Sequence, residues 1–119
     1  MIKLNENEII LHGECKVTNG VIPAKAEPIT TKNNPNLFLN GKLIVAPSET
    51  MGNHHVVEAP NAEFFKINDL FYVKSEEPIH IGCVHENRHD TIELAPGTYE
   101  FGSQLEYDPF KARLEKVKD

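Results

Sequence analysis

Apolar residues in this chain recur mostly at every second position, which is the period of a β-strand. The alternation is clearest in Ile79-His80-Ile81-Gly82-Cys83, where apolar positions alternate with polar or small ones. Shorter apolar runs of strand length occur at residues 8–12, 15–18, 54–58 and 92–94. The pattern predicts a mainly β fold, a small antiparallel barrel or sandwich built of hairpins.

One predicted hairpin has a clear turn signal. Asn40-Gly41 lies between the apolar runs 37–39 and 42–46, as a two-residue type I′ turn prefers. Both turn positions need a positive φ, which asparagine and glycine tolerate best. We therefore expect these two runs to pair as antiparallel strands.

A second predicted hairpin has Asn68-Asp69 at its turn, between residues 63–67 and 70–74. The register that this turn implies gives two cross-strand pairs, Phe65 with Tyr72 and Glu63 with Lys74. An aromatic pair and an opposite-charge pair both favour that register.

The first 35 residues differ from the rest because prolines interrupt them, at Pro23, Pro28 and Pro35. Proline fixes φ and lacks an N–H, so this passage is expected to be an extended arm or surface loop instead of a central strand. Such an arm can reach a neighbouring subunit. We expect a single domain, with the arm and short strands in residues 1–35 and a β core in residues 36–107.

The period changes near the C-terminus. Period two continues from Tyr99 to Tyr107, interrupted only at Gly102-Ser103, which suggests a bulge in one long strand. A terminal helix is then predicted over residues 108–118. It is indicated by an N-cap, a proline at the first helical position and an apolar stripe: Asp108, Pro109, Phe110, Leu114 and Val117.

Composition excludes several classes of partner and location. The chain of 119 residues has 18 acidic and 12 basic side chains, a formal charge of −6, which argues against a nucleic-acid or anionic-membrane surface. The N-terminus lacks the apolar region of a signal peptide, and no apolar run approaches membrane-spanning length, so a cytosolic product is expected. Cys15 and Cys83 form no C-x-x-C pair and are expected to be small buried thiols.

The histidine-rich middle of the chain carries the candidate chemistry. His85-Glu86-Asn87-Arg88-His89 matches the H-E-x-x-H pattern, which on a helix binds zinc and places a glutamate beside a metal-bound water. Here strand-like segments precede and follow the motif. We therefore expect it to fall on a connection between strands, where it would not form a helical protease site.

A metal site in a β context is the alternative. His85 and His89 would meet at the mouth of a hairpin, and His54 or His55 would join them, with Glu58 or Glu86 as an oxygen ligand. The segment Gly52–Glu58 resembles the first histidine motif of cupins, although its two histidines are adjacent, so that only one can face a shared interior. This resemblance implies an enzyme that uses one divalent ion, Zn, Fe or Mn, with Glu86 or Glu106 as acid or base.

A further resemblance extends over residues 42–110. Its segments are Ser48–Val57, His85-Glu86 with His89, Ile92–Tyr99 and Gln104–Tyr107. They resemble a family of small, mostly uncharacterised phage and bacterial proteins that carry T-G-H-x-H, a histidine-glutamate turn, P-G-x-Y and Q-x-E-Y. Asn53 stands where the first histidine of T-G-H-x-H would be, so His55 matches the second. The resemblance implies a phage or prophage setting.

Three functions follow from these observations. We favour a non-enzymatic structural or assembly protein that binds other protein subunits as a homo-oligomer or larger assembly, such as a head-associated or decoration component of a virion. It would use no cofactor and no catalytic residue. The first alternative is the cupin-like metal-dependent enzyme. The second is a small regulatory or inhibitory binding protein, because small β folds host many functions.

Overall fold

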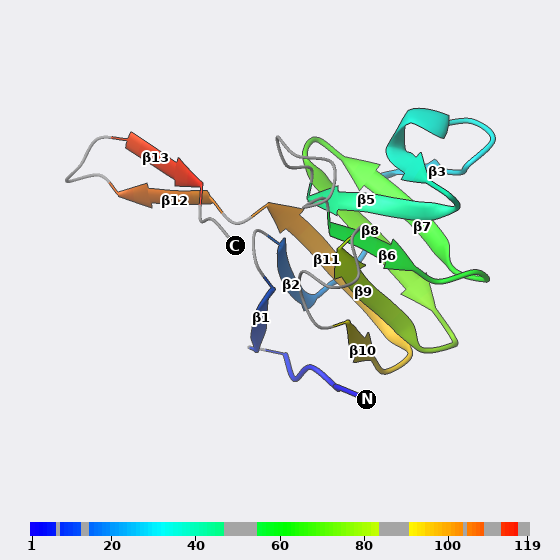
Figure 1. Ribbon diagram of the computed structural model, residues 1–119, viewed down its shortest axis with the longest axis horizontal. Coiled ribbons are helices and arrows are strands. Elements are labelled where there is room, and N and C mark those ends of the chain that lie inside the picture. Colours follow the sequence, from blue (N-terminus) through cyan, green and yellow to red (C-terminus); the bar gives the residue numbers. More distant parts are fainter. Residues whose placement is uncertain are drawn as a thin grey trace.

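The computed structural model contains two antiparallel β-sheets and a separate hairpin (Figure 1). It describes residues 1–6, 8–12, 15–46, 55–83, 91–103, 105–108 and 113–116. Within these ranges the helical element is one 3-10 turn, η1 (Pro35–Leu37). The strands are β1 (Ile9–His12), β2 (Cys15–Asn19), β3 (Glu27–Ile29), β4 (Phe38–Leu39), β5 (Lys42–Ala46), β6 (His55–Glu58), β7 (Glu63–Ile67), β8 (Leu70–Ser75), β9 (Ile79–Cys83), β10 (Ile92–Leu94), β11 (Gly97–Ser103), β12 (Leu105–Asp108) and β13 (Arg113–Lys116).

The strands form a sandwich, the second of the two predicted architectures. The six-stranded sheet has the order β1-β2-β11-β8-β7-β3, and the five-stranded sheet has the order β10-β9-β6-β5-β4. No described strand is shared between them. Strands β12 and β13 pair with each other, and Figure 1 shows this hairpin beside the sandwich, beyond the end of β11. No helix in the described part of the chain is long and apolar enough to cross a membrane.

Both predicted hairpins are confirmed. Strand β4 pairs with β5 across Asn40 and Gly41, whose φ angles of 52° and 81° suit a type I′ turn. Strand β7 pairs with β8 in the predicted register, with Phe65 opposite Tyr72 and Glu63 opposite Lys74. Local turn chemistry therefore determined these registers.

The core lies between the two sheets and follows the alternation seen in the sequence. Its fully buried side chains come from both sheets and include Val17, Val73 and Phe101 from one and Leu43, Val57, Ile79 and Ile81 from the other. Phe38 and Phe64 extend this contact near one edge, with ring centroids 5.6 Å apart in an edge-to-face arrangement. The predicted burial of the Ile79 and Ile81 face of β9 is confirmed.

The N-terminal third is more integrated than the predicted arm. Strand β2 pairs with β11, placing Val17 opposite Phe101, and Cys15 is fully buried, as expected for a small thiol. Strand β3, which contains Pro28, pairs with β7 at the edge of the sheet. Pro28 is thus absent from a central strand, as predicted, but its passage pairs within its own chain.

The C-terminal prediction is wrong where the structure describes it. Residues 113–116, expected to be helical, form β13, which pairs with β12 so that Leu114 lies opposite Tyr107. Arg113-Leu114-Glu115-Lys116 also alternates polar and apolar residues, so the segment has the strand period as well as helical spacing. The expected long strand also ends at residue 103, because β11 and β12 belong to different sheets.

Candidate functional site

His55 is the candidate ligand whose side chain the structure places. It lies on β6, opposite Ala46 of β5 and Cys83 of β9, and its side chain is fully buried. Val57, two residues further on, is also fully buried and lies on the same side of the strand. The imidazole of His55 therefore faces the interior of the sandwich.

Glu58 does not share that environment. It is three residues from His55, so its side chain leaves the opposite side of β6, where 53% of its surface is exposed. Its carboxylate lies 4.0 Å from the ammonium of Lys42 on the neighbouring strand. His55 and Glu58, both predicted as candidate ligands, therefore do not meet in one metal site.

The remaining candidates are placed only in part. His54 and residues 84–90, with His85, Glu86 and His89, lie outside the described residues. The segments on either side of the H-E-x-x-H motif were predicted to be strands, and they are: β9 and β10 pair antiparallel. Glu106 lies on β12, opposite Glu115 of β13. The described side chains contain no group of three histidines, cysteines or carboxylates suited to a metal ion.

Strand edges are the second candidate, because an edge strand presents backbone donors and acceptors to another chain. Three of the four edges of the two large sheets have a protective feature. Strand β10 is covered by Ile2, which exchanges backbone hydrogen bonds of 2.8 and 2.7 Å with Glu93 and Ala95. Strand β3 contains Pro28, which has no N–H, and β4 is only two residues long.

Within the part of the chain that the structure describes, strand β1 is the edge without such a feature. Its sequence is Ile9-Ile10-Leu11-His12, with no proline and no lysine, and it pairs with β2 on one side only. Ile10 packs against the core, whereas Ile9 faces outward and is 53% exposed. An apolar, β-prone edge of this kind favours pairing with a further strand.

The outer face of the six-stranded sheet carries a row of aligned side chains. Strand registers place Thr18, Glu100, Tyr72 and Phe65 side by side across β2, β11, β8 and β7. Tyr72 donates a hydrogen bond to Glu100 at 2.6 Å, and Thr18 donates a longer one to the other carboxylate oxygen at 3.4 Å. Burial, the hydrogen bond and the charge of Glu100 together raise the pKa of Tyr72 to about 12.

The sequence contained a partial signal for these features. Alternation marked Tyr99 and Phe101 as one face of a strand and Glu100 as the other, so an outward Glu100 could be read from it. The cross-strand neighbours of Glu100 could not be predicted from the sequence, because β2 and β8 are far from β11 along the chain. The edge position of β1 likewise depends on the strand order of the whole sheet.

Comparison with known proteins identifies a family without a known activity. No curated protein matches the sequence. No solved structure matches it either. A family described as "Domain of unknown function (DUF8820)" matches residues 12–104, which include every strand of the sandwich except β1, of which only His12 is matched. The chain therefore belongs to this uncharacterised family.

Proposed function

We propose that this domain is a non-catalytic assembly protein that joins other subunits by strand pairing at the edge of β1. The observation that carries the proposal is the contrast among the four edges of the two large sheets. Three are covered, shortened or interrupted by proline, whereas β1 has an exposed Ile9 and no protection from any residue that the structure describes. Proteins that remain monomeric usually protect such an edge.

The partner we propose is a second copy of the same chain. Two β1 strands that pair antiparallel about Ile10 place Ile9 of each opposite Leu11 of the other. The same register brings Glu8 of one chain opposite His12 of its partner, an acidic residue opposite a basic one. The strand is thus complementary to itself, as a twofold symmetric interface requires. The result would be one continuous sheet across two subunits.

The setting we propose is a virion, with the domain as a head-associated or decoration component. Support for the setting comes from the resemblance of residues 42–110 to phage proteins. A symmetric edge contact would serve such a component because it joins identical subunits without a cofactor.

The oligomeric state tests the proposal. Light scattering coupled to size-exclusion chromatography should give a dimer at micromolar to millimolar concentrations, and Ile9→Lys should give a monomer, because a charge on an edge strand opposes pairing. Ile9 is exposed, so the variant should keep its fold. The matched control is Val21→Lys, at a side chain that is 87% exposed and outside β1.

Two results would overturn the proposal. One is a wild-type monomer at the highest concentration. The other is a wild-type dimer that persists in Ile9→Lys, which would place the interface elsewhere.

A metal-dependent enzyme is the second candidate function, and the position of His55 favours it. His55 is buried and directly opposite Cys83, and His85 follows Cys83 by two residues along the chain. The chain that continues after β9 therefore starts beside the end of β6 that carries His55. Metal content tests this candidate, as set out in the Discussion.

A further inference from the structure

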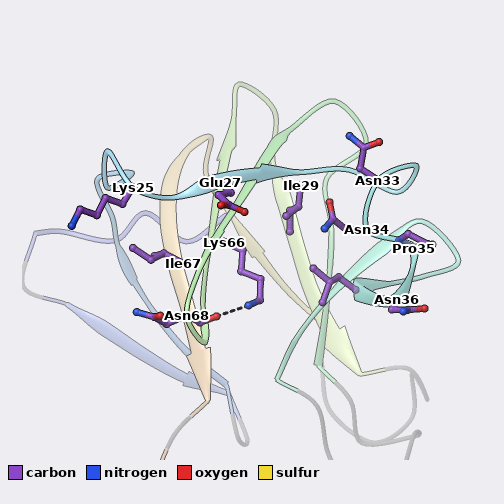
Figure 2. Close-up of a pocket in the computed structure, with 11 residues that line it drawn as sticks. Lys25, Glu27, Ile29, Asn33, Asn34, Pro35, Asn36, Lys66, Ile67 and Asn68 are labelled. Carbon is purple, nitrogen blue, oxygen red and sulfur yellow. Dashed lines mark hydrogen bonds between the residues drawn. The ribbon is translucent and has the colours of Figure 1, made fainter.

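An open groove of about 660 Å³ lies beside β3, at the opposite edge of the six-stranded sheet from β1 (Figure 2). Its walls come from β3, from the turn through Asn34 to Leu37, and from the β7–β8 turn at Ile67 and Asn68. Lysine, asparagine and glutamate side chains line it together with aliphatic ones. The groove thus offers both charged and apolar contacts.

Lys66 places an ammonium group in this groove. It lies on β7, two residues after Phe64 and therefore on the inward side of the strand, and it is half-buried. Its Nζ donates a hydrogen bond to the backbone oxygen of Asn68 at 2.5 Å and lies 5.9 Å from the centre of the Phe71 ring. These contacts fix the amine, and Figure 2 shows it in the middle of the groove.

The ammonium group of Lys66 has N–H donors that its contact with Asn68 does not use. An ammonium has three N–H bonds, and the contact with Asn68 uses one. No carboxylate among the described residues lies within 4.0 Å of it, including Glu27, its register partner on β3. A half-buried cation in this state favours an anionic ligand.

Asn34 adds a second polar side chain to the lining of the groove. Its Oδ1 accepts a hydrogen bond from the backbone N–H of Thr30 at 3.3 Å, and its own N–H donates to the Thr30 oxygen at 2.8 Å. Because the amide oxygen is occupied, the NH₂ group is the part that remains for a ligand. Figure 2 shows this side chain reaching from the turn toward the groove.

The apolar part of the groove lies next to these donors. Leu37 is half-buried, and Ile29 is only 5% exposed. Leu37 therefore supplies most of the aliphatic surface that is partly in contact with water. A ligand with an apolar body would gain free energy by covering that surface.

We propose that this groove binds a small organic carboxylate with an aliphatic body. The carboxylate would accept hydrogen bonds from Lys66 Nζ and Asn34 Nδ2, and the aliphatic part would lie on Leu37 and Ile29. Glu27, which also lines the groove, opposes a second negative charge and so favours a monoanion over a phosphate. The site is independent of the β1 edge.

Hexanoate is the probe, and amide chemical shifts of the ¹⁵N-labelled protein report its binding. We expect saturable shifts at residues of the groove, and much weaker shifts there with hexylamine, hexanol or inorganic phosphate. Lys66→Met removes the charge but keeps an unbranched chain beside Phe71. Asn34→Asp keeps an oxygen for the Thr30 N–H but replaces the NH₂ donor by a negative oxygen. Each should raise the dissociation constant about tenfold or more.

Two control variants carry the same charge changes outside the groove. Lys74→Met removes a lysine from the exposed face of β8, and Asn40→Asp adds a carboxylate at a turn position that tolerates aspartate. Both should bind hexanoate as the wild type does. Thermal melting of all four variants shows that the folds are intact.

The proposal is overturned if hexanoate causes no saturable shifts in the groove. It is also overturned if hexylamine or hexanol bind equally well, or if folded Lys66→Met binds hexanoate with unchanged affinity.

Discussion

Tyr72 and Glu100 form a 2.6 Å hydrogen bond across the outer face of the six-stranded sheet, between directly paired positions of β8 and β11. Tyr72 is only 4% exposed although its side chain leaves the outer face. Its ring is therefore buried, and its hydroxyl is hydrogen-bonded to Glu100. The contact makes folding stability depend on the protonation of one phenol.

The first prediction concerns alkaline pH. The pKa of Tyr72 is about 12 in the folded protein and 10.0 ordinarily, so the folded chain retains a proton that the unfolded chain releases. The contribution of Tyr72 to stability is therefore complete below about pH 10 and is lost as the pH rises toward 12. Urea unfolding should show this loss, of about 2 kcal/mol or less.

Tyr72→Phe isolates this effect. The variant should cost about 1 kcal/mol at neutral pH, through loss of the hydrogen bond to Glu100, and should lose less stability than the wild type above pH 10. Tyr99, whose pKa burial also raises, should still contribute an alkaline loss in that variant. An equal alkaline loss in Tyr72→Phe and wild type would contradict the assignment.

The second prediction separates backbone strain from crowding at the first hairpin. A Cβ on Gly41 would meet no atom within 4 Å, but its φ of +81° disfavours any residue with a side chain. Gly41→Ala should therefore destabilise the domain by about 1 kcal/mol without disturbing the packing. Chemical denaturation measures the loss, and nuclear magnetic resonance should show changes confined to the β4–β5 turn. Unchanged stability would mean that the turn is not type I′.

The third prediction compares a buried and an exposed leucine. Leu43 is fully buried between the sheets, whereas Leu70 is 36% exposed at the start of β8. Leu43→Ala should lower the free energy of unfolding by about 2–5 kcal/mol, because it leaves a cavity. Leu70→Ala should cost about 1 kcal/mol or less. Similar losses in equilibrium denaturation would argue against the sandwich core described above.

The fourth prediction concerns metal. If the domain is an assembly protein, mass spectrometry of untagged protein should find well under one zinc, iron or manganese ion per chain, even after incubation with these ions. A stoichiometric ion that is lost in His85→Ala, with the fold retained, would favour the enzyme. His55→Ala is the companion variant, although its burial makes a loss of stability part of the expected result.

Sequence reasoning succeeded where the determinants were local. Asn40-Gly41 specified the first turn, and the pairs Phe65–Tyr72 and Glu63–Lys74 specified the second register, because each pair is joined by a single short hairpin. The alternation in residues 79–83 likewise predicted which side of β9 is buried.

It failed where distant segments decide the outcome. The C-terminal residues have both helical and strand periods, and pairing with β12 selects the strand. The row through Tyr72 and Glu100 depends on the order of strands in the sheet, which no local pattern contains.

The position of β11 has a consequence for how the protein is made. Strand β2 lies beside β11 in the folded sheet, so Val17 pairs with Phe101, although most of the chain separates these two residues. Hairpins such as β7–β8 can close on the ribosome as soon as they emerge, but the six-stranded sheet cannot be completed until β11 has been synthesised. Contacts between such distant segments slow folding. During translation, β2 therefore has no partner strand on the side that β11 later occupies until β11 has been synthesised.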